Sequence, residues 1–332
     1  MLLKKILQTV VGEDNTLLLF QTLVVPRALM TESEKVTRAH IAQALNMVLF
    51  HDLLQRVPSG AKYVDKKIAE NDKVVFDHGA LRTVAWGDNG NLPQGRASIT
   101  RVLEALGYTE AAIYPLPRLK MTGYAYQHVD HPADIAQYFV SELHPELFSQ
   151  PFQQAVTEIL SSSVDPLSAH DLALLDRLKN QETISLDEAA QIVKAGVSCF
   201  SRHHNEPRIN DYETLKAESA EMAWIATEGN VFNHATDRVP DVFAAAATLR
   251  AEGARIKDKV EISATGRVRQ TALMADKVSR GFIDDKGGRF MLDVPGSFYE
   301  FISRDKLPDT DTIDLAFDTG NATGIFNVTA AR

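Results

Sequence analysis

The sequence predicts an α+β protein made of two similar units, each a strand followed by a helix and further strands, with a block of helices between them. Three observations lead to this prediction. The phrase VFDHGALR at 75–82 is nearly repeated as VFNHATDR at 231–238. Each copy lies in the first expected strand of its unit, ahead of a helix and more strands. The residues between the two units have helical periodicity.

Composition limits the class of protein. A chain of 332 residues with 45% hydrophobic and 24% charged residues is typical of a soluble globular protein with a sizeable core. The formal charge of −9 argues against a nucleic-acid partner, because Lys and Arg dominate binding to phosphates. Cys199 is the single cysteine, so no disulfide can form within the chain, which fits a reducing, cytoplasmic location.

Residues 1–30 are interpreted as an N-terminal extension, with Met30 as an alternative start because TESEK after it reads as a helix N-terminus. The two apolar runs before it are separated by Glu13, Asp14 and Asn15. Neither run reaches the roughly 18 residues of a membrane span, and no small-residue cleavage site follows. We therefore expect no membrane association and no secretion signal.

Residues 31–332 are expected to form one catalytic domain whose first half spans 73–130. An amphipathic helix at 33–56 precedes this half. Within the half we expect a strand at 74–86, a helix at 97–107 that ends at Gly107, and strands at 111–116 and 119–129.

The helical insertion is expected at 131–222 and the second half at 223–332. In the insertion, helices are predicted at 133–143, 149–162, 167–179, 186–199 and 211–221. In the second half, we predict a strand at 223–236, a helix at 241–253, a turn at 284–288, and strands within 259–265, 268–275, 289–304, 312–317 and 324–328.

The repeated phrase predicts a paired histidine site. Because side chains alternate along a strand, His78 and Arg82 should share one face while Asp77 points to the other. If a pseudo-twofold axis relates the two units, His78 and His234 can point into one cavity. Two neutral imidazoles in a cavity are suited to binding a cation.

Glu300 is the expected third ligand, because it lies in an apolar run, GSFYEFISR, where an unpaired carboxylate would be costly to bury. Two histidines and one carboxylate leave coordination positions open, as in non-heme Fe(II) oxygenases, and the same set also serves catalytic zinc. Arg82 would grip a substrate carboxylate in a fork-like manner. Arg238, at the expected end of its strand, is interpreted as a surface ion-pair residue.

The sequence contains a second candidate metal site, which is called the rival site below. His128 and Asp130 form an H-x-D pair, and His203 or His204 would supply the missing histidine. That ligand set belongs to jelly-roll proteins built almost wholly of strands, whereas a helical block is expected directly after Asp130. We therefore interpret Asp130 as part of a turn that opens the next helix, and the two later histidines as helix C-terminal residues.

The motifs that carry a family resemblance are VFDHGALRTV, EGNVFNHATDRVPDV, GSFYEFISRD and GNATGIFN. From about residue 40 onwards the chain resembles the 2-oxoadipate dioxygenase/decarboxylase family, also called hydroxyglutarate synthases. The resemblance implies two βαβββ units like those of the vicinal-oxygen-chelate fold, forming a mixed half-barrel around a metal. It implies His78, His234 and Glu300 as iron ligands and Arg82 as the carboxylate-binding residue. Gly320 and Asn321 stand where longer members carry an apolar residue and a serine that line the substrate site.

The function implied is an Fe(II)-dependent dioxygenase that converts 2-oxoadipate and O₂ to 2-hydroxyglutarate and CO₂ in lysine breakdown. Its partners would be a small 2-oxo diacid and O₂, with no nucleic acid and no membrane. Two alternatives stay open: a zinc-dependent hydrolase or lyase on the same scaffold, and a non-catalytic sensor of small acids. The sequence leaves the oligomeric state open.

Overall fold

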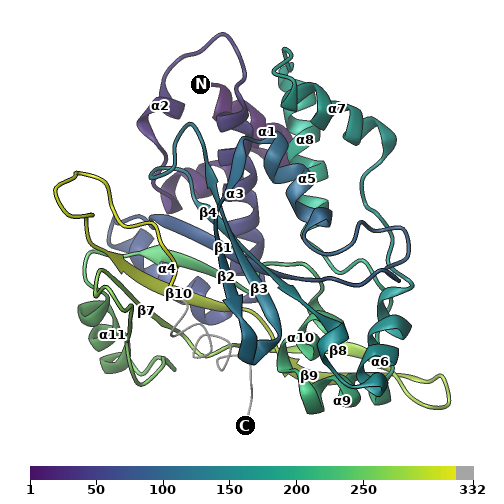
Figure 1. The fold of residues 1–332 in the computed structure, drawn as a ribbon. Coiled ribbons are helices and arrows are strands. Elements are labelled where there is room, and N and C mark those ends of the chain that lie inside the picture. Colours follow the sequence, from purple (N-terminus) through teal and green to yellow (C-terminus); the bar gives the residue numbers. More distant parts are fainter. Residues whose placement is uncertain (319–332) are drawn as a thin grey trace.

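A mixed sheet of eight strands, in the order β2-β3-β4-β1-β5-β10-β7-β6, forms the centre of the computed structural model, which describes residues 1–318 (Figure 1). A separate two-stranded sheet pairs β8 with β9. The predicted α+β half-barrel is confirmed. The strands are β1 (Phe76–Val84), β2 (Tyr108–Leu116), β3 (Met121–His128), β4 (Gln137–Leu143), β5 (His234–Arg238), β6 (Glu261–Ile262), β7 (Val268–Ala272), β8 (Lys277–Ile283), β9 (Arg289–Pro295) and β10 (Phe298–Arg304).

The sheet has an internal pseudo-symmetry centred on β1 and β5, which pair antiparallel. Each of these strands has a parallel neighbour on its other side, β4 for β1 and β10 for β5. Beyond the neighbour, each half adds antiparallel strands, β3 and β2 on one side and β7 and β6 on the other. With α5 and α11 as the helices after the first strands, both halves are βαβββ units, as predicted.

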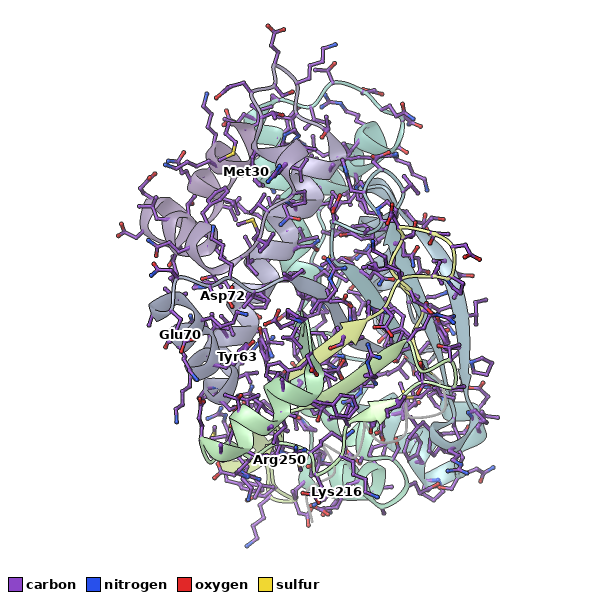
Figure 2. The ribbon with its side chains drawn as sticks, turned by 90° about the vertical axis from the view of Figure 1, so that its left-hand side faces the viewer. Met30, Tyr63, Glu70, Asp72, Lys216 and Arg250 are labelled. Atoms are coloured by element: carbon purple, nitrogen blue, oxygen red, sulfur yellow. The ribbon has the colours of Figure 1, made fainter. Side chains whose placement is uncertain are left out.

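Helices cover one face of this sheet. Phe50 on α3 packs against Phe76 and Tyr299, and Tyr63 on α4 packs against Tyr299. Figure 2 shows α4, which carries Tyr63, and α11, which carries Arg250, on the same side of the sheet. The helices are α1 (Leu2–Thr22), α2 (Arg27–Met30), α3 (Arg38–Arg56), α4 (Pro58–Ala69), α5 (Ala97–Ala105), α6 (Gln150–Leu160), α7 (Ala169–Lys179), α8 (Leu186–Cys199), α9 (Ile209–Glu218), α10 (Ala220–Glu228) and α11 (Val242–Ala251).

The N-terminal segment and the insertion add two further packed regions. In α1, the side chains of Leu3, Ile6 and Leu7 are buried in the core shared with α3 and α8. Within the described residues, no helix combines the length and apolar character needed to cross a membrane. A second core joins α6, α9 and α10 to the β8–β9 hairpin, with Phe152 and Phe282 fully buried in it (Figure 1).

Two predicted elements were wrong. Residues 133–143, expected as a helix opened by Asp130, instead lead into β4, which pairs with β1 on one side and β3 on the other. Tertiary pairing of the buried Tyr138 and Val140 overrides the local helical pattern. The strand expected at 223–236 is mostly helix α10, capped by the Ser219 hydroxyl.

Three other segments also bear on the predicted secondary structure. The helix α4 was not expected, and Pro58 at its start is a favourable first residue. The run at 312–317 forms only an isolated bridge, Lys306 with Ile313, rather than a strand. The run at 324–328 lies outside the described residues.

Candidate metal centre

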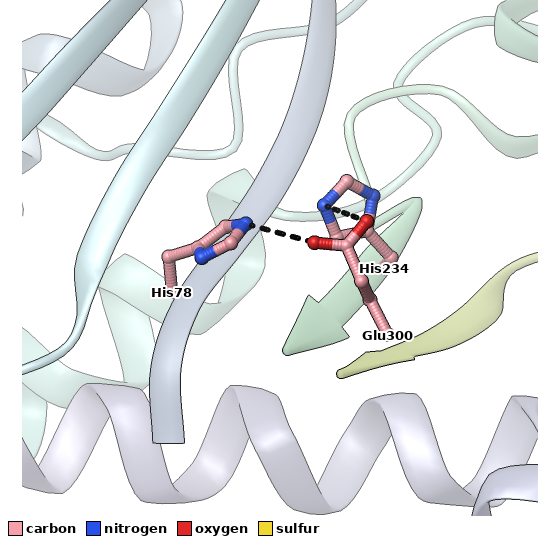
Figure 3. Close-up of side chains that lie close together, drawn as sticks. All are labelled: His78, His234 and Glu300. Carbon is pink, nitrogen blue, oxygen red and sulfur yellow. Dashed lines mark ion pairs between the residues drawn. The ribbon is translucent and has the colours of Figure 1, made fainter. Parts of the chain in front are cut away.

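Three neighbouring strands at the middle of the sheet bring His78, His234 and Glu300 together (Figure 3). Glu300 on β10 and His78 on β1 each lie opposite Thr236, on the intervening strand β5. His234 is two positions from Thr236 and therefore shares its face. One ligand atom from each of the three side chains lies within 4.8 Å of the others. The structure thus places three sequence-predicted residues in one cluster.

Burial controls the charges in this cluster, because His78, His234 and Glu300 are at most 5% exposed. Burial lowers the pKa of both histidines, and the neighbouring His78 lowers that of His234 further. Burial, with added repulsion from Glu261, raises the pKa of Glu300 to about 8. Near neutral pH the metal-free cluster therefore consists of two neutral imidazoles and a largely protonated carboxyl group.

Asp77 fixes the orientation of His78, with its Oδ1 2.8 Å from His78 Nδ1. The other ring nitrogen, Nε2, faces the centre and lies 3.6 Å from Glu300 Oε1. The expectation that Asp77 points to the opposite face was wrong. A β-bulge between Phe76 and His78 interrupts the alternation, so Asp77 and His78 lie on the same side.

Asn233 holds the equivalent position before the second histidine, with its Nδ2 3.2 Å from His234 Nδ1. Its Oδ1 is buried without a hydrogen-bond partner among the described residues. Turning the amide would let Oδ1 accept from a protonated Nδ1, leaving Nε2 of His234 free to bind a cation. The Asp and Asn in the repeated phrase contact the two histidines, which the sequence reasoning missed, and their repetition was the available signal.

The cluster fits a divalent cation by its own chemistry. Glu300 Oε2 is buried, has no hydrogen-bond partner in the part of the chain that the structure describes, and lies 3.9 Å from His234 Nε2. The Thr236 hydroxyl lies between the other two atoms that face the centre. It is 3.1 Å from His78 Nε2 and 3.1 Å from Glu300 Oε1. Two imidazole nitrogens and a carboxylate oxygen around one point are a common donor set for zinc and iron.

A pocket of about 440 Å³, which includes its open mouth, adjoins the cluster. Its mixed apolar and polar walls suit a small polar molecule. The lining residues are His78, Ala80, Phe139, Ser141, Asn233, His234, Gln270, Glu300, Phe317 and Asp318.

Arg82 lies two positions beyond Ala80 on β1 and is fully buried. Its guanidinium carbon is 4.8 Å from the ring centre of Trp224. Burial lowers the pKa of Arg82 to about 10, and the nearby Glu221 partly offsets this effect. The group stays a cation at neutral pH, on the face of β1 that carries His78.

The rival site is not assembled. Asp130 instead forms a bidentate salt bridge with Arg38, whose Nε and Nη2 each donate to one carboxylate oxygen at 2.8 Å. His203 and His204 both contact backbone carbonyl oxygens. Among the described residues, the only group of three or more potential metal ligands is the one with Glu300.

Three further predicted residues, Arg238, Gly320 and Asn321, are not part of the cluster. Arg238, interpreted as a surface ion-pair residue, is instead three-quarters buried. It donates to the carbonyl oxygen of Ala133 and lies 3.9 Å from Asp77. The predicted substrate-lining pair, Gly320 and Asn321, lies outside the described residues.

The fold and this cluster define a class: a protein of paired βαβββ units with a buried group of two histidines and one glutamate able to hold a metal inside the curved sheet. The sequence places the chain within that class. Residues 36–310 match the model of the 2-oxoadipate dioxygenase/decarboxylase family, and the chain belongs to this family. No curated protein matches the sequence closely enough to count as a relative.

Solved structures share the fold. A glyoxalase superfamily protein from Ralstonia eutropha JMP134 is 51% identical, with a TM-score of 0.92 over 96% of this chain and 99% of that chain. The hydroxyglutarate synthase of Oryza sativa in complex with 2-oxoadipate is 17% identical, with a TM-score of 0.67 over 90% and 97% of the two chains. The Pseudomonas putida hydroxyglutarate synthase in the same complex is 18% identical, with a TM-score of 0.60 over 90% and 75%.

Proposed function

We propose that this chain is an Fe(II)-dependent dioxygenase that converts 2-oxoadipate and O₂ to 2-hydroxyglutarate and CO₂, a step of lysine breakdown in the cytoplasm. The observation that carries the proposal is the buried cluster of His78, His234 and Glu300 in a chain of this family. Two hydroxyglutarate synthases of the same fold have been solved with 2-oxoadipate bound. The reaction balances: CO₂ carries away the C1 carboxylate of 2-oxoadipate, and both oxygen atoms of O₂ end in 2-hydroxyglutarate, one in its new carboxylate and one in its hydroxyl group.

In this proposal His78, His234 and Glu300 would hold the iron, and the iron would supply open coordination positions for a 2-oxo acid and O₂. The chain prepares the site in two ways. Asp77 accepts a hydrogen bond from the Nδ1–H of His78, so that Nε2 presents a lone pair to the centre. Glu300 must release its proton before it can bind the cation as a carboxylate.

Arg82 is the residue we assign to the substrate carboxylate remote from the iron. It is a buried cation whose guanidinium stacks over Trp224, so its planar donors are held in one orientation. Phe139 and Phe317, with ring centres 4.8 Å apart, form an apolar wall of the pocket. Such a wall excludes water and strengthens the charge interactions of the substrate inside. The predicted roles of Gly320 and Asn321 in substrate choice stay proposals.

The test is O₂ uptake by protein purified without oxygen and loaded with Fe(II). Uptake with stoichiometric CO₂ release on 2-oxoadipate supports the proposal, and 2-oxoglutarate serves as the competing substrate. The variant Glu300→Gln should bind iron poorly and consume no O₂. His131→Ala is the matched control, because His131 stacks on His128 outside the pocket and should leave uptake unchanged.

The outcomes separate the alternatives. Bound iron without O₂ uptake on either acid would refute the dioxygenase. Bound zinc with hydrolysis or elimination would favour a hydrolase or lyase instead. Stabilisation of the fold by an oxo acid without any turnover would identify a sensor.

A further inference from the structure

A single buried arginine on β10 connects the metal cluster to the segment that covers its pocket. We propose that Arg304 is a positioning residue that holds His78, through Asp77, and also holds the cover segment, residues 314–317. The proposal rests on the proposed function only in that the cluster binds a divalent metal. It does not depend on the substrate or on O₂ chemistry.

The first connection runs from Arg304 to the histidine. The Arg304 side chain is fully buried, and its Nε and Nη2 donate to both carboxylate oxygens of Asp77 at 2.9–3.1 Å. A forked pair of this kind fixes the plane of the carboxylate. Asp77 Oδ1 is in turn 2.8 Å from Nδ1 of His78. The orientation of the imidazole is therefore set by a chain of two buried contacts.

The second connection runs from the same guanidinium to the cover segment. Nη1 of Arg304 donates to the carbonyl oxygens of Asp314 and Ala316, at 2.9 and 2.7 Å. Its guanidinium carbon lies 5.4 Å from the ring centre of Phe317. Phe317 lines the pocket, and its ring centre is 4.8 Å from that of His78. One side chain thus places both a cluster residue and the pocket wall beside it.

The second half of the molecule provides an internal comparison. Asn233 takes the place of Asp77 in the repeated phrase and contacts His234. Among the residues that the structure describes, its neutral amide has no hydrogen bond to an arginine or to residues 314–317. Within residues 1–318, hydrogen bonds therefore connect His78 to the cover segment through Asp77 and Arg304, and no equivalent chain connects His234 to it.

The experiment compares the whole protein with Arg304→Met in two measurements that do not need turnover. The first is the affinity for Co(II), measured by calorimetry on metal-free protein. The second is amide hydrogen exchange in peptides that contain Ala316 and Phe317. We expect Arg304→Met to lower the Co(II) affinity by roughly 10- to 100-fold and to speed exchange of the cover segment at least tenfold.

Three variants make the result specific. Tyr114→Phe removes only the hydroxyl that accepts from the Phe317 N–H, so exchange should rise with Co(II) affinity unchanged. Asn233→Ala should lower the Co(II) affinity with exchange unchanged. Arg269→Met removes another forked arginine–aspartate pair, with Asp305, outside the pocket, and should change neither measurement.

A loss of Co(II) affinity without faster exchange in Arg304→Met, or the reverse, would overturn the proposal. If that variant fails to fold because Asp77 is left as an unpaired buried charge, two replacements serve. Arg304→Lys keeps the charge but cannot reach all four acceptors, so both readouts should shift. Asp77→Asn combined with Arg304→Met removes both charges, and an unchanged exchange rate there would equally refute the proposal. A protein that passes these tests but consumes no O₂ would refute only the proposed function.

Discussion

Metal binding by the cluster should weaken about 50-fold when the pH falls from 8 to 6, a loss of about 2.3 kcal/mol of binding free energy. Burial raises the pKa of Glu300 to about 8, so the metal must displace its proton throughout this range. Burial lowers the pKa of both histidines, which weakens the competition of their protons with the metal. The displaced proton makes the affinity fall about fivefold between pH 8 and 7 and about ninefold between pH 7 and 6.

Calorimetry of Co(II) binding at pH 6, 7 and 8 tests this prediction. Repeating the titration in two buffers of different ionisation enthalpy counts the protons released, and we expect about 0.9 at pH 7. Glu300→Gln should bind Co(II) weakly with no pH dependence between 6 and 8. An affinity of the native protein that stays constant over that range, or binding without proton release, would refute the charge state assigned to Glu300.

The same raised pKa makes the metal-free protein less stable at higher pH. The folded state binds the Glu300 proton more tightly than the unfolded state, whose pKa is near 4.5. The stabilisation is therefore complete below pH 4.5 and is lost as the pH rises towards 8. Between pH 5 and 8 the loss is about 3.5 kcal/mol. Urea unfolding of metal-free protein should show it, and Glu300→Gln should remove it.

Three substitutions test other contacts. Gly79→Ala should destabilise the fold by about 1–3 kcal/mol, measured by urea unfolding, because a Cβ there would lie 2.3 Å from Phe232 Cζ; unchanged stability would contradict the packing. Tyr63→Phe removes the donor to Asp237, 2.8 Å away, and should cost about 1–3 kcal/mol. Burial raises the pKa of Asp237 to about 6, so the cost should be larger at pH 8 than at pH 5, and an equal cost would refute this. Arg82→Lys should raise KM for 2-oxoadipate by about 10- to 100-fold at unchanged Co(II) affinity, and an unchanged KM would remove Arg82 from substrate binding.

Much of the site could be predicted from the sequence because its residues lie in a repeated phrase on regular strands. Alternation along a strand predicted that His78 and Arg82 share one face, and the repeat correctly brought His234 to His78. Their roles as ligand and substrate residues stay predictions. Asp77 was misplaced because a β-bulge breaks the alternation, and nothing in a single sequence marks that bulge.

The errors in secondary structure have two physical causes. In β4, hydrogen bonding to strands on both sides stabilises an extended chain that local propensity does not favour. At 220–228, the signals were present but overlooked: Ser219 caps the helix, and Gly229, with φ of 69°, ends it. Arg304 could not be predicted at all, because its partners Asp77 and Ala316 come from distant segments.

The wide separation in sequence of His78 and Glu300 has a consequence for when the protein can acquire its metal. His78 leaves the ribosome early, whereas Glu300 follows only after the insertion and most of the second half. At roughly 5–20 residues per second, the interval between them is roughly 10–45 s. During that time the nascent chain lacks Glu300, so the cluster of His78, His234 and Glu300 cannot form. We therefore expect the metal to bind after translation, from the metal ions available to the completed protein.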